Sequence, residues 1–175
     1  MKKYLLLFLV LYVAAVCFTG CTDSTVAAND EPDDPTMFSK KSIVGIWVAI
    51  DSKSRVLYYY DIKSNSHLHY VEYDSSTDDD AWAYYGEDGY MHTTNNIEWD
   101  VKGDMTYNFD ESEQVIRCTK GTLWGMSVST LVFLLGSDEI FEVKRIGLDE
   151  GYIYDNTGYL KDAHVYRIKG TKKDL

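Results

Sequence analysis

Apolar and polar side chains alternate at every second residue over much of this chain, and this pattern constrains the fold most. It is clearest in residues 97–101 (IEWDV) and 105–109 (MTYNF), where each run has one apolar and one polar side. A period of two is typical of a β-strand with one buried face. Lys102, Gly103 and Asp104 lie between the two runs, and glycine favours a hairpin turn there.

Further strand-like runs extend along the chain and are separated by short segments rich in Ser, Asp, Asn and Gly. No long stretch after the first twenty residues has the 3.6-residue period of a helix. We therefore predict an all-β domain, an antiparallel up-and-down barrel, with a β-sandwich as the alternative. The remaining predicted strands span residues 43–50, 55–62, 67–73, 82–94, 115–119, 123–135, 139–146 and 163–169.

Composition sets the size of the fold and excludes two classes of protein. The chain has 175 residues, which corresponds to one domain. Hydrophobic residues make up 45% and aromatic residues 14%, so the chain is not disordered as a whole. The formal net charge of −11 leaves no excess of basic side chains to neutralise phosphates, so we expect no nucleic acid partner.

Residues 1–20 have the features of a secretory signal peptide. Lys2 and Lys3 give a basic start, and residues 4–18 form an apolar run without charge. A helix of this length spans about 22 Å, which is shorter than the roughly 30 Å hydrocarbon layer of a membrane. The segment is therefore predicted to be a leader and not a permanent transmembrane helix.

Phe18-Thr19-Gly20-Cys21 resembles the lipobox of bacterial lipoproteins. The resemblance implies that Cys21 becomes the acylated N-terminus, with membrane lipid as its partner, because two or three acyl chains anchor a protein stably. It also implies a location in the bacterial cell envelope. Thr22, in place of aspartate after the cysteine, favours the outer membrane. A plain secretory leader followed by an unmodified cysteine is the alternative.

The segment 21–41 is predicted to be an acidic, flexible tether between this anchor and the folded domain. It contains both prolines of the chain and a cluster of acidic residues around them, with few apolar residues. The β-domain is predicted to span residues 42–170, followed by a short tail at 171–175.

Gly45-Ile46-Trp47 follows the tether and resembles the Gly-x-Trp entry of lipocalin-like proteins. In that family the tryptophan closes the base of an eight-stranded barrel, and an arginine from the last strand packs on its ring. The resemblance assigns this plug to Gly45, Trp47 and Arg167. In a sandwich, Trp47 would be an ordinary core residue, so a contact between Trp47 and Arg167 distinguishes the two folds.

His67 and His69 are candidate metal ligands. Two residues apart on a strand, they share one face and could supply two ligands of a zinc site. No spacing in the sequence specifies a third ligand, and the alternative is a pair of half-exposed histidines. We predict no metal and no cofactor. The remaining cysteine, Cys118, has no partner for a disulfide and is expected to be a small core residue.

No motif for catalysis is present. The sequence has no nucleophile elbow, phosphate-binding loop, helical zinc motif or dinucleotide fingerprint, and no pair of carboxylates stands out. We therefore do not expect an enzyme.

Tyrosine and tryptophan are concentrated in residues 58–90. Consecutive tyrosines on a strand point to both faces, so some must lie outside the core or line a cavity. Such rings bury apolar area and keep a hydroxyl for hydrogen bonding, as in many binding sites. The alternative is aromatic packing on a twisted sheet. The candidate ligand-binding residues are Tyr58, Tyr60, Tyr70, Tyr73, Trp82, Tyr84 and Tyr90.

Two functions fit these features. The first is a non-enzymatic protein that binds a small apolar or aromatic ligand, or a glycan, against the aromatic strands. The alternative is a structural or interaction module with a filled barrel, which docks another envelope protein through an aromatic surface. A cavity lined by tyrosines would favour the first, and an exposed aromatic patch the second.

Overall fold

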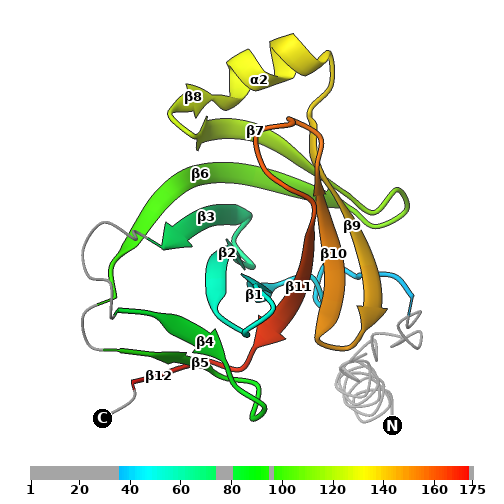
Figure 1. The fold of residues 1–175 in the computed structure, drawn as a ribbon. Helices are drawn as coiled ribbons and strands as arrows, with labels where there is room; N and C mark the ends of the chain where they lie inside the picture. The colour runs from blue at the N-terminus through cyan, green and yellow to red at the C-terminus, as the bar shows by residue number, and fades with distance from the viewer. Residues whose placement is uncertain (1–35, 74–80, 95–96, 174–175) are drawn as a thin grey trace, which may run out of the picture. The chain divides into compact units, whose positions relative to one another are not determined.

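Eight antiparallel strands follow one another around a ring in the computed structural model (Figure 1). The structure describes residues 36–73, 81–94 and 97–173, so the leader, Cys21 and most of the tether lie outside the described residues. In chain order the ring strands are β1 (Gly45–Ile50), β2 (Val56–Ile62), β3 (His67–Tyr73), β6 (Trp99–Asp110), β7 (Val115–Leu123), β9 (Glu139–Gly147), β10 (Glu150–Asp155) and β11 (Ala163–Ile168).

The predicted all-β fold with an antiparallel up-and-down barrel is confirmed. Each ring strand pairs with the next one along the chain, and β11 pairs back onto β1. Because neighbouring strands run in opposite directions, β1, β3, β7 and β10 begin at one end of the barrel. We call this end the base and the opposite end the rim.

The predicted turn at residues 102–104 is wrong, because β6 runs through it without interruption. Gly103 instead lies within β6, where side chains of neighbouring strands pack closely against its backbone. A Cβ atom at this position would lie 2.9 Å from Leu123 Cδ1 and 3.0 Å from Tyr70 Cβ. Glycine is therefore required for close packing inside the strand, and it does not mark the end of a strand.

The run 123–135 was predicted as a strand, and most of it is helical. After β7 the chain forms the short strand β8 (Met126–Ser127) and then helix α2 (Val128–Leu135). The Ser127 side chain caps the helix by accepting the Thr130 N–H, and Gly136 ends it with a φ of 69°. These two caps outweigh the strand preference of an apolar, partly β-branched run.

A second, three-stranded sheet packs on the outside of the barrel. It is formed by the hairpin of β4 (Ala83–Tyr85) and β5 (Met91–Thr93), together with β12 (Thr171–Lys173) parallel to β5. Residues 171–173, assigned above to a tail, are therefore part of a sheet. Val48, Val56 and Ile168 from the barrel form a small core with Ala83 and Met91 of this sheet.

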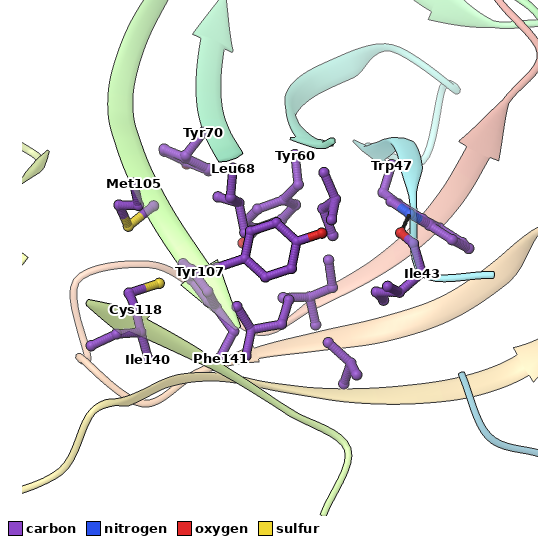
Figure 2. Close-up of a cluster of buried hydrophobic side chains, with 14 of the residues drawn as sticks. Ile43, Trp47, Tyr60, Leu68, Tyr70, Met105, Tyr107, Cys118, Ile140 and Phe141 are labelled. Carbon is purple, nitrogen blue, oxygen red and sulfur yellow. Dashed lines mark hydrogen bonds between the residues drawn. The ribbon is translucent and has the colours of Figure 1, made fainter. Parts of the chain in front are cut away.

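The main core lies inside the barrel. Large side chains from different strands meet there, among them Trp47, Tyr60, Tyr70 and Phe141, all fully buried (Figure 2). This filled interior gives the barrel its stability, because burial of apolar surface is the dominant favourable contribution to folding.

The segment 36–44, which we call the strap, lies across the base. Phe38 is only 2% exposed and packs edge-on against Trp47, with 5.2 Å between the ring centroids. Gln114 accepts the Phe38 N–H at 2.8 Å and donates to its carbonyl at 2.9 Å. The buried Arg145 donates to the Met37 carbonyl at 3.1 Å. Residues 36–41, assigned to the tether from sequence, are thus packed against the barrel.

Replacing Phe38 by alanine tests whether the strap is part of the folded unit. We expect Phe38→Ala to lower the free energy of unfolding by about 3 kcal/mol, because it removes a buried aromatic ring and leaves a cavity. The matched control is Leu148→Ala, at a residue that is 74% exposed, and its effect should stay within about 0.5 kcal/mol. Chemical denaturation measures both, and equal small effects would show that the strap contributes nothing.

Candidate functional site

The three residues assigned to the barrel plug lie together at the base. Trp47 and Arg167 are direct partners in the β1–β11 register, and the Arg167 guanidinium carbon lies 5.5 Å from the centroid of the Trp47 ring. Gly45 has a φ of 148°, and a Cβ atom there would lie 2.9 Å from Arg167 Cδ. Arg167 also donates to Asp149 Oδ1 at 2.7 Å. These contacts hold the end of the barrel together.

The candidate ligand-binding tyrosines of β2 and β3 fill the interior of the barrel. Tyr60 is 0% exposed and Tyr70 1% exposed, and their ring centroids lie 5.3 Å apart. Tyr60 also meets Phe141 edge-on at 5.5 Å. Tyr58 packs against both tyrosines nearer the rim, and burial raises the pKa of its hydroxyl to about 12. Tyr60 and Tyr70 are therefore part of the main core, and Tyr58 packs against it.

The other predicted aromatic residues lie elsewhere. Trp82 and Tyr84 pack against each other at the outer sheet, with their rings tilted by 32° and their centroids 4.9 Å apart. The Lys172 ammonium group lies over the ring of Tyr90, with 4.0 Å between Lys172 Nζ and the ring centroid. Tyr73 is at the rim end of β3. The seven candidate residues are therefore divided among several places and do not form one site.

A row of aromatic side chains that the sequence analysis missed runs across the outside of the barrel. The ring centroids of neighbours in the row lie 5.9, 4.8, 4.7 and 5.3 Å apart. Its members are partly exposed and come from β10, β11 and β4. The signal was the alternation of tyrosines in residues 152–154, where no strand was predicted. In order the row is Tyr154, Tyr152, His164, Tyr166 and Tyr85.

The connection between β7 and β9, at the rim, exposes large apolar side chains. In α2, Val128 and Leu131 are buried in the main core, while Phe133 is 84% and Leu134 62% exposed. Trp124, in the turn before β8, is 44% exposed. No charged residue occurs in α2. One face of this helix thus packs on the barrel and the other presents an uncharged apolar surface to solvent.

Two adjoining depressions lie at the base. The first has a volume of about 410 Å³ and lies between the strap, the turn joining β2 to β3, and β6. The second, of about 430 Å³, is more open and shares Val44 and Ser64 with the first. The first is lined by Lys40, Lys41, Val44, Ser64, Ser66, Tyr107, Asn108 and Phe109.

His67 and His69 lie on the outer face of β3, where residues alternate with the buried Leu68 and Tyr70. His69 Nε2 lies 3.4 Å from Asp104 Oδ1, and His69 Nδ1 lies 3.3 Å from Lys63 Nζ. Within the described ranges, no group of three or more His, Cys, Asp or Glu side chains is arranged to hold a metal ion. The nearest neighbours of His69 are thus a carboxylate and an ammonium group.

Cys118 is fully buried in the main core, and its environment makes the thiol unreactive. Burial raises the pKa of Cys118 to about 12, with a smaller contribution from the charge of Asp138. The thiol therefore stays protonated at neutral pH, whereas a nucleophilic cysteine needs a thiolate.

Comparison with known proteins does not assign the chain to a family. No family model, no curated protein and no solved structure matches it. Among the described residues, no helix is long and apolar enough to cross a membrane.

Two matched substitutions in the barrel interior test how its tyrosines are packed. Within the described part of the chain, the buried Tyr60 hydroxyl has no hydrogen-bond partner, whereas the Tyr107 hydroxyl donates to the Lys63 carbonyl at 2.9 Å. We expect Tyr60→Phe to raise the free energy of unfolding by about 1 kcal/mol and Tyr107→Phe to lower it by about 1 kcal/mol. Urea denaturation checks both, and a destabilising Tyr60→Phe would mean that this hydroxyl is bonded inside the barrel.

Proposed function

We propose that this protein is a lipid-anchored, non-enzymatic docking module of the bacterial cell envelope, which binds another envelope protein through its rim. The observation that carries the proposal is the exposed apolar face of α2, formed by Phe133 and Leu134. A lone exposed apolar residue is common in soluble proteins, but neighbouring ones on an uncharged helix are typical of an interaction surface.

A filled barrel supports docking over ligand carriage. The ligand hypothesis needs space beside Tyr60 and Tyr70, and these two rings instead pack against each other and against Phe141. A small apolar ligand or a glycan would have to displace fully buried side chains from the main core. The rim and the outer aromatic row are already exposed and need no such rearrangement.

The energetics of the rim favour a protein partner. Burying an exposed phenylalanine or leucine side chain contributes about 1.5–3 kcal/mol each. Trp124, in the turn before β8, is a further exposed apolar side chain at the rim. Tryptophan and phenylalanine are also among the residues enriched at protein–protein interfaces. The helix is capped at both ends and fixed to the core by Val128 and Leu131, so little order must be gained on binding.

The arrangement of the two barrel ends fits an anchored protein. The strap lies at the base, so the chain that leads back to Cys21 leaves the barrel there. Helix α2 follows β7 and therefore lies at the rim. An acyl anchor at Cys21 would keep the domain near the lipid through the flexible tether, and the rim is the end of the barrel opposite the strap.

A photo-crosslinking amino acid at the rim tests the docking surface in cells. With benzoylphenylalanine at Phe133, we expect one discrete adduct with a protein, and the adduct should be lost when Leu134→Ser is added. The same probe at Leu148, an exposed apolar residue in the turn between β9 and β10 at the base, is the matched control. The proposal fails if Phe133 gives no adduct or if Leu148 gives the same one.

The anchor is tested separately by changing the cysteines near the end of the leader. We expect Cys21→Ser to move the protein from the membrane fraction to the soluble fraction, because the acceptor thiol is lost. Cys17→Ser, four residues earlier in the leader, should leave the protein membrane-bound. Mass spectrometry of the N-terminal peptide is the decisive measurement, and an unmodified Cys21 would contradict the lipid anchor.

A further inference from the structure

The depression at the base contains positive charge in a protein that is acidic as a whole. Lys40 and Lys41 line it from the strap, and Lys63 lines the adjoining depression together with Asp61. No carboxylate lines the first depression. Among the described residues, no hydrogen bond or ion pair engages the ammonium groups of Lys40 and Lys41. Two cationic groups are therefore available at a concave surface.

The carboxylates near the base are already engaged. Glu111 accepts the Lys40 backbone N–H at 2.9 Å. Asp110 accepts from the Ser112 hydroxyl at 2.7 Å and from the backbone beyond it, and these hydrogen bonds lower the pKa of Asp110. Asp61 pairs with Lys63 at 3.4 Å. Asp110 and Asp61 are thus bound by groups of their own turn and strand, and Glu111 is bound by the backbone of the strap.

The walls of the depression are fixed by hydrogen bonds. On one side the strap turns sharply, with the Ile43 N–H donating to the Ser39 carbonyl at 3.0 Å. On the other side, the turn from β2 to β3 is held by Tyr107. Its hydroxyl donates to the Lys63 carbonyl and its backbone N–H to the Ser66 carbonyl, both at 2.9 Å. The depression is therefore formed before any ligand arrives.

We propose that this depression binds the phosphate group of an anionic phospholipid headgroup. The ammonium groups of Lys40 and Lys41 supply the charge, since lysine acts on phosphate as a point charge. The hydroxyls of Ser64 and Ser66 supply hydrogen-bond donors beside them. Val44 and Phe109 give the apolar wall that the glycerol end of a lipid would contact. The volume of about 410 Å³ suits a headgroup of this size.

The position of the depression favours a lipid over free phosphate as the source. The strap that carries Lys40 and Lys41 begins fifteen residues after Cys21 in the sequence. A fully extended chain of the fourteen residues 22–35 reaches about 50 Å at most, so an acylated Cys21 would keep the domain within reach of a membrane surface. This choice of source rests on the proposed anchor, whereas binding of phosphate at the lysines does not.

The test uses the chain from residue 21 onward with Ser at position 21, so that no acyl group contributes to binding. All the contacts described for the barrel lie within residues 36–173, so this chain retains them. Short-chain dihexanoylphosphatidylglycerol and inorganic phosphate are titrated separately, and backbone amide NMR shifts are followed. We expect saturable binding of the lipid, with the largest shifts at Ser64, Ser66 and Asn108, and weaker binding of inorganic phosphate.

Two double variants that remove the same charge distinguish binding in the depression from nonspecific electrostatic attraction of the lipid. Lys40→Gln with Lys41→Gln should weaken lipid binding at least about tenfold, since each lysine near an anionic lipid is worth roughly fivefold. Lys120→Gln with Lys161→Gln, two exposed lysines away from the depression, removes the same charge and should leave affinity unchanged. Equal losses in both variants, shifts outside the depression, or equally tight binding of inorganic phosphate would overturn the proposal. Because Cys21 and Phe133 play no part in this test, its outcome is independent of the anchor and of the docking surface.

Discussion

The pairing of β1 with β11 is the interaction on which the rest of the structure depends. It closes the ring and sets Trp47 opposite Arg167. It also fixes which side chains of β1 face inward, because a slip by one residue would exchange the two faces of the strand. Trp47 and Ala49 join the main core, while Val48 joins the small core beneath the outer sheet. Both faces of β1 are therefore covered, and its sequence is almost continuously apolar.

Much of the barrel could be predicted from the sequence because alternation reports directly on burial. Residues 67–73 and 139–146 were placed correctly, and the contact expected between Trp47 and Arg167 is present. The predictions failed where a local sequence preference was opposed by contacts with residues far away in the sequence. Gly103 favours a turn in isolation, but Leu123 and Tyr70 approach it too closely for any side chain. The run 123–135 resembled a strand because it is apolar and partly β-branched, and the alternation does not report the caps at Ser127 and Gly136 that make most of it helical.

The candidate site was harder to predict than the fold. A count of tyrosines gives no information on which of them face the interior, and Tyr60 and Tyr70 proved to be core residues. The depression at the base combines the strap with β6 and the turn after β2, so Lys40 and Phe109 become neighbours only through the fold. Phe133 and Leu134 were hidden in a segment assigned to the wrong type of element. Sites assembled from distant segments leave no pattern in the linear sequence.

Closure between the first and last ring strands has a consequence for biosynthesis. A chain emerges from the ribosome with its N-terminal end first, so β1 exists long before residues 163–168 are made. Until then its apolar edge lacks a partner, and long-range strand pairing of this kind is slow and exposed to aggregation. The barrel can be closed only when residues 163–168 have been synthesised, so the seven earlier ring strands must wait without a complete partner set until the last one is made.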